Sequence, residues 1–407
     1  MSILVRRCKG RFYLTGTARL GLIVFLTTLA ISFVGTIWAV YLESFLGSPA
    51  KVGFFSAVIT LFSFFSYFYI TPLVEKSSKS RLFSYSLFLM AVCYLLFAIN
   101  KKFYILILLV FIVTLITAIK ITSLGIIIKD KAPPKKLSRN EGLMYTFFNI
   151  SWLVGPLIAG YISQKYGFNI IFLLSAIITL ISLFYFRISR IQDANTTKKI
   201  DGNLWNNFFA FFNNKERVIA YVLGGGVNLW LIFIYLFVPL FIINSGLGDV
   251  WIGYFLFAVA IPTISFEYFF SKIACKTGFK KMFNVGFLIL SSLSLICFFI
   301  GNIYLILGIL AVAGVGVAMI ESTTESYFLD LLKTKKDELR FYGPYNTSID
   351  ANHFIGEFIS AVILVFLPFK FLFVLFGFFM FVLFLISTRI RDVVEDKKIV
   401  KCRTAGA

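Results

Sequence analysis

The chain has 407 residues, of which 59% are hydrophobic and 14% charged, and its mean hydropathy is +0.90. That composition leaves too little polar surface for a water-soluble domain, so a soluble globular protein is excluded. A formal net charge of +20 would suit nucleic-acid binding. The lysines and arginines lie between the apolar runs, however, as they do in membrane proteins, and we reject a nucleic-acid partner. Five scattered cysteines without a CxxC pair and a single histidine argue against a zinc site or a disulfide framework, so we expect neither metal nor cofactor.

Apolar runs of roughly 20 residues, enough for a helix to cross about 30 Å of hydrocarbon, recur along the chain. The first run, 20–41, follows five basic residues, as a signal peptide would, but no small-residue cleavage site comes after it. We therefore expect a retained first helix. The further runs span 52–71, 82–99, 103–128, 143–162, 168–186, 218–243, 251–270, 282–300, 304–329, 344–366 and 370–388. The sequence thus predicts an all-α polytopic membrane protein with twelve transmembrane helices.

The chain repeats its pattern after about 200 residues. The charged turn Thr71–Arg81 is echoed by a second charged turn, Ser271–Lys281. The same offset, or an offset of 201, joins Gly53 to Gly253, Asp130 to Asp330, Arg139 to Arg340, and Gly155 to Gly356. The sequence therefore predicts two parallel repeats of six helices each.

The distribution of lysine and arginine predicts the orientation in the membrane. With the N-terminus inside, 33 of the 39 Lys and Arg residues lie on the cytoplasmic side and five outside, while Lys120 lies within a span. We therefore expect both termini to be cytoplasmic and the protein to lie in the plasma (inner) membrane. The predicted parts are an N-terminal bundle at 1–190, a cytoplasmic linker at 191–217, a C-terminal bundle at 218–390 and a cytoplasmic tail at 391–407.

The end of the linker has an amphipathic pattern. Its apolar residues share one helical face, and its asparagines share the other. The first set is Leu204, Trp205, Phe208, Phe209 and Phe212, and the second is Asn206, Asn207 and Asn213. This pattern predicts a short helix in the inner membrane interface; the alternative is an early start of the seventh span.

Two charged turns and one glycine–proline element carry a resemblance to a known family. The first turn follows the pattern G-x-L-a-D-r-x-G-r-r, with Thr71 in place of the opening Gly; its matching residues are Leu73, Glu75, Lys76, Ser78 and Lys79. The second turn has Cys275 at the acidic position; its matching residues are Ile273, Ala274, Lys276, Gly278, Lys280 and Lys281. The fifth span contains Gly155-Pro156 and Gly160, similar to a G-P-x-x-G-G element. Together with the two six-helix repeats, these motifs resemble the major facilitator superfamily over nearly the whole chain.

The resemblance implies a cytoplasmic gate in which charges of the two halves pair. The expected gate residues are Glu75, Lys76, Lys79, Asp130, Arg139, Lys276, Gly278, Asp330 and Arg340. Glu75 would accept hydrogen bonds at the N-terminus of the eleventh helix, where the helix dipole is positive. The alternative is that these residues anchor loops to anionic headgroups. Gly155, Pro156 and Gly160 would form a helix interface that bends.

Ionisable residues inside the spans are the candidates for function, because burying them is costly unless they are paired or hydrated. The candidates for the substrate and proton pathway are Lys120, Glu321, Glu325, Asp350, His353 and Glu357. Lys120 lies in the fourth helix, and Glu321 and Glu325 lie in the tenth. These helices are repeat counterparts, so a pseudo-twofold axis would place Lys120 opposite the two acids, and the resemblance places both helices along the substrate path. We expect Glu325 to be essential for proton coupling. The alternatives are a static ion pair of the acids with Lys120, and a structural hydrogen bond between Asp350 and His353.

No P-loop, HExxH or G-x-S-x-G pattern is present, so we expect neither ATP hydrolysis nor enzymatic catalysis by this chain. We expect a monomeric secondary active transporter that moves a small molecule by alternating access, is coupled to protons and works within the lipid bilayer. Isolated acids in an apolar cavity favour efflux of amphipathic compounds. The alternatives are proton-coupled uptake of a small polar nutrient or organic anion, and a non-transporting membrane sensor on the same scaffold.

Overall fold

The computed structural model describes residues 5–8, 11–14, 16–131, 137–189, 191, 204–332 and 334–390. The predicted tail and most of the predicted linker therefore lie outside the described residues, as do the side chains of Asp130, Arg139 and Cys275.

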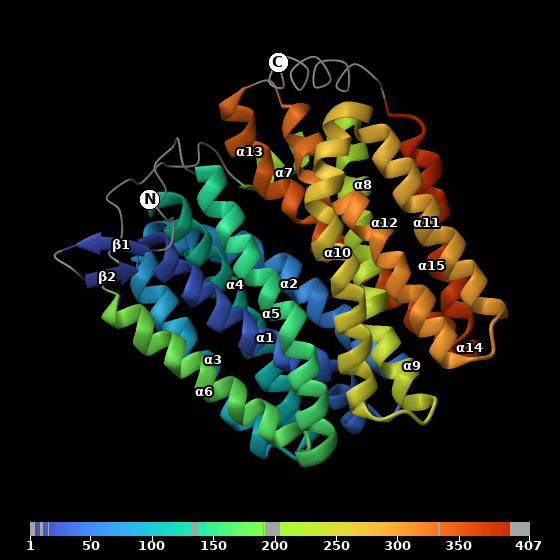
Figure 1. Ribbon diagram of the computed structural model, residues 1–407, viewed down its shortest axis with the longest axis horizontal. Coiled ribbons are helices and arrows are strands. Elements are labelled where there is room, and N and C mark those ends of the chain that lie inside the picture. The colour runs from blue at the N-terminus through green and yellow to red at the C-terminus, as the bar shows by residue number, and fades with distance from the viewer. Residues whose placement is uncertain are drawn as a thin grey trace. The chain divides into compact units, whose positions relative to one another are not determined.

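The described chain is almost entirely helical (Figure 1). Two short strands near the N-terminus, β1 (Val5–Cys8) and β2 (Arg11–Leu14), pair antiparallel. The helices of the first half are α1 (Gly16–Leu46), α2 (Pro49–Lys76), α3 (Lys79–Ile99), α4 (Phe103–Lys131), α5 (Leu137–Tyr166), α6 (Phe168–Ile188) and α7 (Leu204–Phe212). Those of the second half are α8 (Lys215–Ile232), the π-helical turn η2 (Phe233–Phe237), α9 (Val238–Asn244), α10 (Asp249–Thr277), α11 (Phe279–Phe299), α12 (Ile303–Asp330), α13 (Lys335–Asn346), α14 (Ser348–Phe366) and α15 (Phe371–Ser387).

The predicted membrane-spanning helices are present. Among the described residues, eleven helices are long and apolar enough to cross a membrane, and α15 is a shorter apolar helix of 17 residues. Two of the eleven are composite: α8, η2 and α9 form one span, Lys215–Asn244, and α13 leads into α14 over Arg340–Phe366. The predicted all-α fold is confirmed, and the twelve predicted spans correspond to these eleven helices and the shorter α15.

The chain divides into two compact units, and each is described by itself. The first comprises Met1–Tyr41, Phe65–Lys199 and Gly248–Tyr254, and the second Leu42–Phe64, Ile200–Leu247 and Phe255–Ala407. The beginning of α2 therefore groups with the second unit, and the beginning of α10 with the first. The domain boundaries proposed from the sequence stay a prediction.

The two units repeat the same packing pattern. In the first unit α3 packs against α4 and α6, and in the second α11 packs against α12 and α15 (Figure 1). The α3 and α11 helices begin at Lys79 and Phe279, and the α4 and α12 helices at Phe103 and Ile303, which reproduces the 200-residue offset of the sequence. Serine hydroxyls support one of these contacts, because Ser291 and Ser294 of α11 donate to carbonyl oxygens of α15 at 2.9 and 2.8 Å.

The linker helix α7 forms where the sequence predicts it, but its buried face differs from the prediction. Asn207, assigned to the polar face, is only 3% exposed, whereas Phe209 is 64% exposed. The reason is that α7 packs against α13 and α8, so one of its faces contacts protein. Phe211 is fully buried among aromatic rings of α8, α12 and α13, those of Tyr221, Phe328 and Phe341.

Replacing Phe211 by Ala should destabilise the protein by about 3–5 kcal/mol, because a buried ring is lost and a cavity remains. Thermal or denaturant unfolding in detergent would measure this loss. Phe209→Ala on the same helix is the matched control and should cost less than about 0.5 kcal/mol, because its ring is exposed. Equal losses for the two variants would contradict the packing of α7 described here.

Candidate functional site

The first part of α2 lies close to α14 within the second unit. A Cβ atom at Gly53 would lie 2.9 Å from the Ala361 Cβ and 3.2 Å from the Glu357 carbonyl oxygen. The rings of Phe54 and Phe358 meet edge to face, with centroids 5.7 Å apart. A side chain at Gly53 would therefore push the two helices apart, and the missing Cβ permits their close approach.

Glu357 is the most deeply buried acidic side chain at this contact. It is 3% exposed and shares a side-chain hydrogen bond with Thr60 of α2. Its Oε2 atom has no hydrogen-bond partner among the described residues, and neither has the fully buried Oγ of Ser360, one turn along α14. A buried carboxylate without a cation is costly to keep charged. The neutral form of Glu357, carrying a proton, is therefore the less costly one at this position.

Two more ionisable groups share this part of α14. The carboxylate of Asp350 has a side-chain hydrogen bond with Ser63 of α2, and its charge acts on Glu357. Asp350 and Glu357 are seven positions apart, which corresponds to about 10 Å along a helix. Half-buried His353 lies between them. The three side chains thus form a line of proton-binding groups along α14, and hydroxyl groups of α2 contact the first and the last of them.

Glu321 and Glu325 of α12 have more polar surroundings. Glu325 is exposed and accepts a 2.7 Å hydrogen bond from the Tyr342 hydroxyl of α13. Glu321 is half-buried, and its charge acts on Tyr235 of η2. Among the described residues no Lys or Arg pairs with Glu325. Burial therefore favours Glu357 over Glu325 as the residue that carries a proton.

Lys120 of α4 belongs to the first unit and is 4% exposed. No acidic side chain among the described residues of that unit pairs with it. Its predicted position opposite Glu321 and Glu325 stays a prediction, since those acids belong to the second unit.

The first of the two predicted gate turns is held by local contacts. The Lys79 Nζ donates to the Glu75 carbonyl oxygen at 2.9 Å, and the charges of their side chains attract. Ser78 caps α3 by accepting from the Arg81 N–H at 3.5 Å. Lys76 is exposed at the end of α2.

The second predicted gate turn and the gate residues near it are mostly exposed, and their contacts differ from those of the first turn. Gly278 precedes α11 as its N-cap residue with φ +85°, a conformation that favours glycine, and Lys276 is exposed two residues before it. Asp330 is exposed at the end of α12. Arg340 donates its Nε to Asn207 Oδ1 at 2.9 Å, so it contacts the linker helix α7.

The three helix-interface residues of α5 face two different helices of the first unit. Gly155 lies directly against Ser32 of α1. Gly160 faces α10, where a Cβ would lie 3.0 Å from the Gly253 Cα, and the Pro156 carbonyl oxygen lies 2.5 Å from a Cβ built at Gly253. A second contact, missed from the sequence, joins the same helices, because Ser163 Oγ donates to Asp249 Oδ2 at 2.5 Å.

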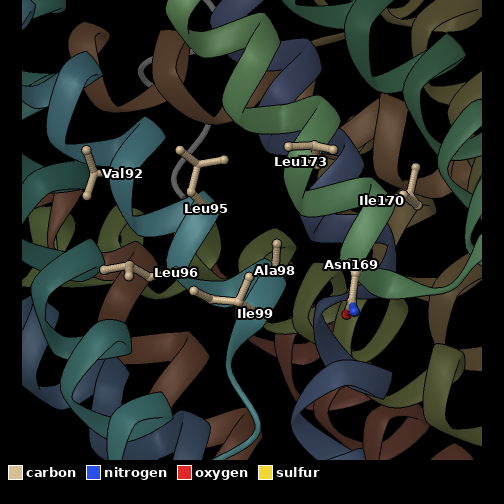
Figure 2. A pocket seen from close by; sticks show the side chains of 8 residues that line it. All are labelled: Val92, Leu95, Leu96, Ala98, Ile99, Asn169, Ile170 and Leu173. Carbon is tan, nitrogen blue, oxygen red and sulfur yellow. The ribbon is translucent and has the colours of Figure 1, made fainter.

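A hollow of the first unit is lined by none of the predicted site residues. It is an open hollow of about 500 Å³ between α3 and α6, and its lining is Val92, Leu95, Leu96, Ala98, Ile99, Asn169, Ile170 and Leu173 (Figure 2). Asn169 is the one polar side chain among them, so the pocket suits hydrocarbon and not a polar solute. Within the described residues, no cluster of three or more His, Cys, Asp or Glu could hold a metal ion.

Comparison with known proteins identifies the family. The family model of the Major Facilitator Superfamily matches residues 20–335, which is most of the chain. The chain belongs to the Major Facilitator Superfamily. It is therefore an integral, multi-pass membrane protein of the transporter type. No match among curated proteins was found for this superfamily member.

Solved structures share the superfamily fold at low sequence identity. The nucleoside transporter NupG is 12% identical, with a TM-score of 0.73, over 92% of this chain and 99% of that one. A POT family transporter in complex with a thioalcohol-conjugated peptide is 12% identical, with a TM-score of 0.75, over 96% and 97% of the two chains. A POT family transporter in complex with 5-aminolevulinic acid is also 12% identical, with a TM-score of 0.74, over 91% and 95%. At these identities the likeness concerns the fold.

Proposed function

We propose that this protein is a proton-coupled secondary active transporter that exports amphipathic, positively charged compounds by alternating access. It would act as a monomer in the plasma (inner) membrane with both termini in the cytoplasm. The observation that carries the proposal is Glu357, a 3% exposed carboxylate with one unpartnered oxygen among the described residues. In a transporter such a group can bind a proton on one side of the membrane and release it on the other.

The proton would move along one face of α14. Asp350 lies near the beginning of this helix, His353 follows one turn later, and Glu357 lies one turn further. Hydrogen bonds from Ser63 and Thr60 of α2 orient the two carboxylates. A change in the contact between α2 and α14 would alter the hydrogen bonding of both acids, and this would link proton binding to conformation.

The expected charge of the substrate follows from the carboxylates of α12. Glu325 is exposed, lacks a basic partner among the described residues and is oriented by Tyr342. Tyr345 stacks on Phe328 with centroids 4.0 Å apart and interacts with the Glu325 charge. Aromatic rings beside an uncompensated carboxylate favour organic cations.

A second candidate is proton-coupled uptake of a zwitterion or organic anion, which one observation favours. Lys120 is a buried cation for which the first unit provides no described acidic partner. The two POT family structures that share the fold contain a conjugated peptide and 5-aminolevulinic acid. A cation in the pathway would bind the carboxylate of such compounds.

The proposal is tested with purified protein in sealed vesicles that contain a pH-sensitive dye. Compounds are added one at a time without an imposed pH gradient: lipophilic cations, amino acids, peptides, nucleosides and organic acids. A lipophilic cation that changes the internal pH, only in vesicles with protein, would support export. A response to zwitterions or anions alone would favour the second candidate, and no response to any compound would contradict both.

The predicted gate gives a separate expectation. Glu75→Ala should loosen the cytoplasmic gate and increase the labelling of single cysteines placed at the beginning of α14, by a factor of about two or more, corresponding to about 0.4 kcal/mol. Labelling with a membrane-impermeant maleimide from the cytoplasmic side measures the effect, and Glu216→Ala, at the exposed beginning of α8, is the control. Unchanged labelling in Glu75→Ala would exclude the gate role and favour the alternative of a loop anchor.

A further inference from the structure

Two arginines of the second unit lie on the same aromatic ring. The guanidinium carbons of Arg217 in α8 and Arg340 in α13 are 4.0 and 5.0 Å from the centroid of Phe341. Their like charges act on one another, and Asp337 is the acidic side chain whose charge acts on Arg217. Two cations and one acidic side chain leave a local excess of positive charge, which an anion would stabilise.

The same place has more hydrogen-bond donors than acceptors. Arg217 donates to the carbonyl oxygens of Phe211 and Ala210 at 3.2 and 2.9 Å, which ties it to the end of α7. Arg340 uses its Nε for Asn207, while its two terminal nitrogens have no partner in the described part of the chain. The Nδ2 of Asn207, itself 3% exposed, is buried without an acceptor among the described residues. A buried donor without an acceptor costs about 1–3 kcal/mol.

The amide of Asn207 cannot be turned to remove this deficit. Its Oδ1 accepts from Arg340, and turning the group would place the NH₂ against the guanidinium. The buried Nδ2 of Asn207 therefore lacks an acceptor among the described residues, and the terminal nitrogens of exposed Arg340 are available to an acceptor from outside them.

The cluster lies beside the beginning of a segment that is long and apolar enough to cross a membrane. Helix α7 ends at Phe212, and the spanning segment that begins with α8 starts three residues later at Lys215. The outer face of α7 carries Phe209 and Phe212, which are 64% and 38% exposed. Exposed aromatic rings next to basic groups are typical of helices that lie in the headgroup region.

We infer that Arg217, Arg340 and Asn207 bind the phosphate group of an anionic phospholipid. The free edge of the Arg340 guanidinium suits two oxygens of a phosphate, and the Asn207 amide would donate to a third. Phe209 and Phe212 would contact the upper part of the acyl chains. With the proposed orientation the site faces the cytoplasmic leaflet, which carries anionic lipids. The bound lipid would join α7 to α13 and thereby stabilise the second unit.

The test uses the full-length protein in neutral detergent and measures thermal unfolding with added phosphatidylglycerol or phosphatidylcholine. Phosphatidylglycerol should raise the Tm by about 3 °C or more relative to phosphatidylcholine, because a ligand of the native state stabilises it. Arg340→Gln should lose this difference, and Arg81→Gln, an exposed arginine of α3, should keep it. Equal shifts with the two lipids, or an unchanged difference in Arg340→Gln, would overturn the inference.

A second variant separates loss of lipid binding from a folding defect. Asn207→Asp keeps the shape of the side chain and its bond from Arg340, but it replaces the unsatisfied donor by an anionic acceptor. It should unfold near the wild-type Tm without lipid and lose the response to phosphatidylglycerol. Inorganic phosphate at millimolar concentration is the last arm: no shift is expected, and a shift equal to that with lipid would overturn the assignment to a membrane lipid.

Discussion

Glu357→Gln should reduce proton-driven accumulation of the substrate at least tenfold, while exchange of labelled for unlabelled substrate continues. The amide has the size of the protonated acid and can keep the contact with Thr60, but it can neither bind nor release a proton. Exchange of substrate for substrate moves no net proton, and the variant keeps Glu325, the carboxylate assigned to the cationic substrate, so it should still perform this exchange. A tenfold loss corresponds to about 1.4 kcal/mol. Parallel measurement of gradient-driven accumulation and counterflow in vesicles separates the two steps.

Glu325→Gln is the matched control, because it removes a carboxylate of the same unit that is exposed and bonded to Tyr342. We expect this variant to keep its dependence on the proton gradient and to bind cationic substrates more weakly, with a raised KM. The reverse result, loss of coupling in Glu325→Gln and normal coupling in Glu357→Gln, would show that burial is a poor guide to the proton site.

Gly253→Leu should lower the transport rate at least tenfold without preventing membrane insertion. The α10 backbone at Gly253 lies so close to α5 that a Cβ would be 2.5 Å from the Pro156 carbonyl oxygen and 3.3 Å from the Gly160 Cα. Backbone atoms cannot move aside as a flexible side chain can, so a leucine must separate the two helices. The separation would also break the bond between Ser163 and Asp249.

Initial transport rates, corrected for the amount of folded protein in the vesicles, measure this effect. Gly308→Leu is the control, because Gly308 also lies in a membrane-spanning helix but, among the described residues, no neighbouring side chain or other helix lies within 4 Å of a Cβ built there. Normal transport by Gly253→Leu would mean that the close contact of α5 and α10 is not required in the transport cycle.

The fold could be predicted because both of its signals are visible in the sequence itself. Hydropathy marks the membrane-spanning runs, and the 200-residue spacing of matching residues marks the repeat. The offset predicted that the first and second charged turns would be equivalent, and α3 and α11 begin at Lys79 and Phe279. The burial of individual residues in α7 could not be predicted in this way. Amphipathic spacing cannot tell whether a helix face contacts lipid or protein, and the rings around Phe211 come from segments up to 130 residues away.

The candidate site could be predicted only as a set of ionisable residues. Glu357 could not be ranked above Glu325 from the sequence, since both lie in apolar runs; the difference is the burial that α2 and its neighbours impose. Thr60, Ser63 and Ser360 were not singled out, because serine and threonine are common in such runs and usually bond to their own helix. Gly53 and Gly253 were noticed as an echo between the repeats, and each of them marks a close approach of two helices.

Reversal of the proton gradient tests coupled transport most directly. Vesicles that contain the protein are given a pH difference of one unit, acidic inside or acidic outside, while the membrane potential is clamped. The amount of a labelled lipophilic cation inside the vesicles, one identified in the dye assay, is then measured. One exchanged proton should support up to about tenfold accumulation in acidic vesicles and a corresponding depletion in alkaline ones, because one pH unit is worth about 1.4 kcal/mol. Equal distribution of the compound in both directions, in vesicles whose pH difference persists, would contradict the account.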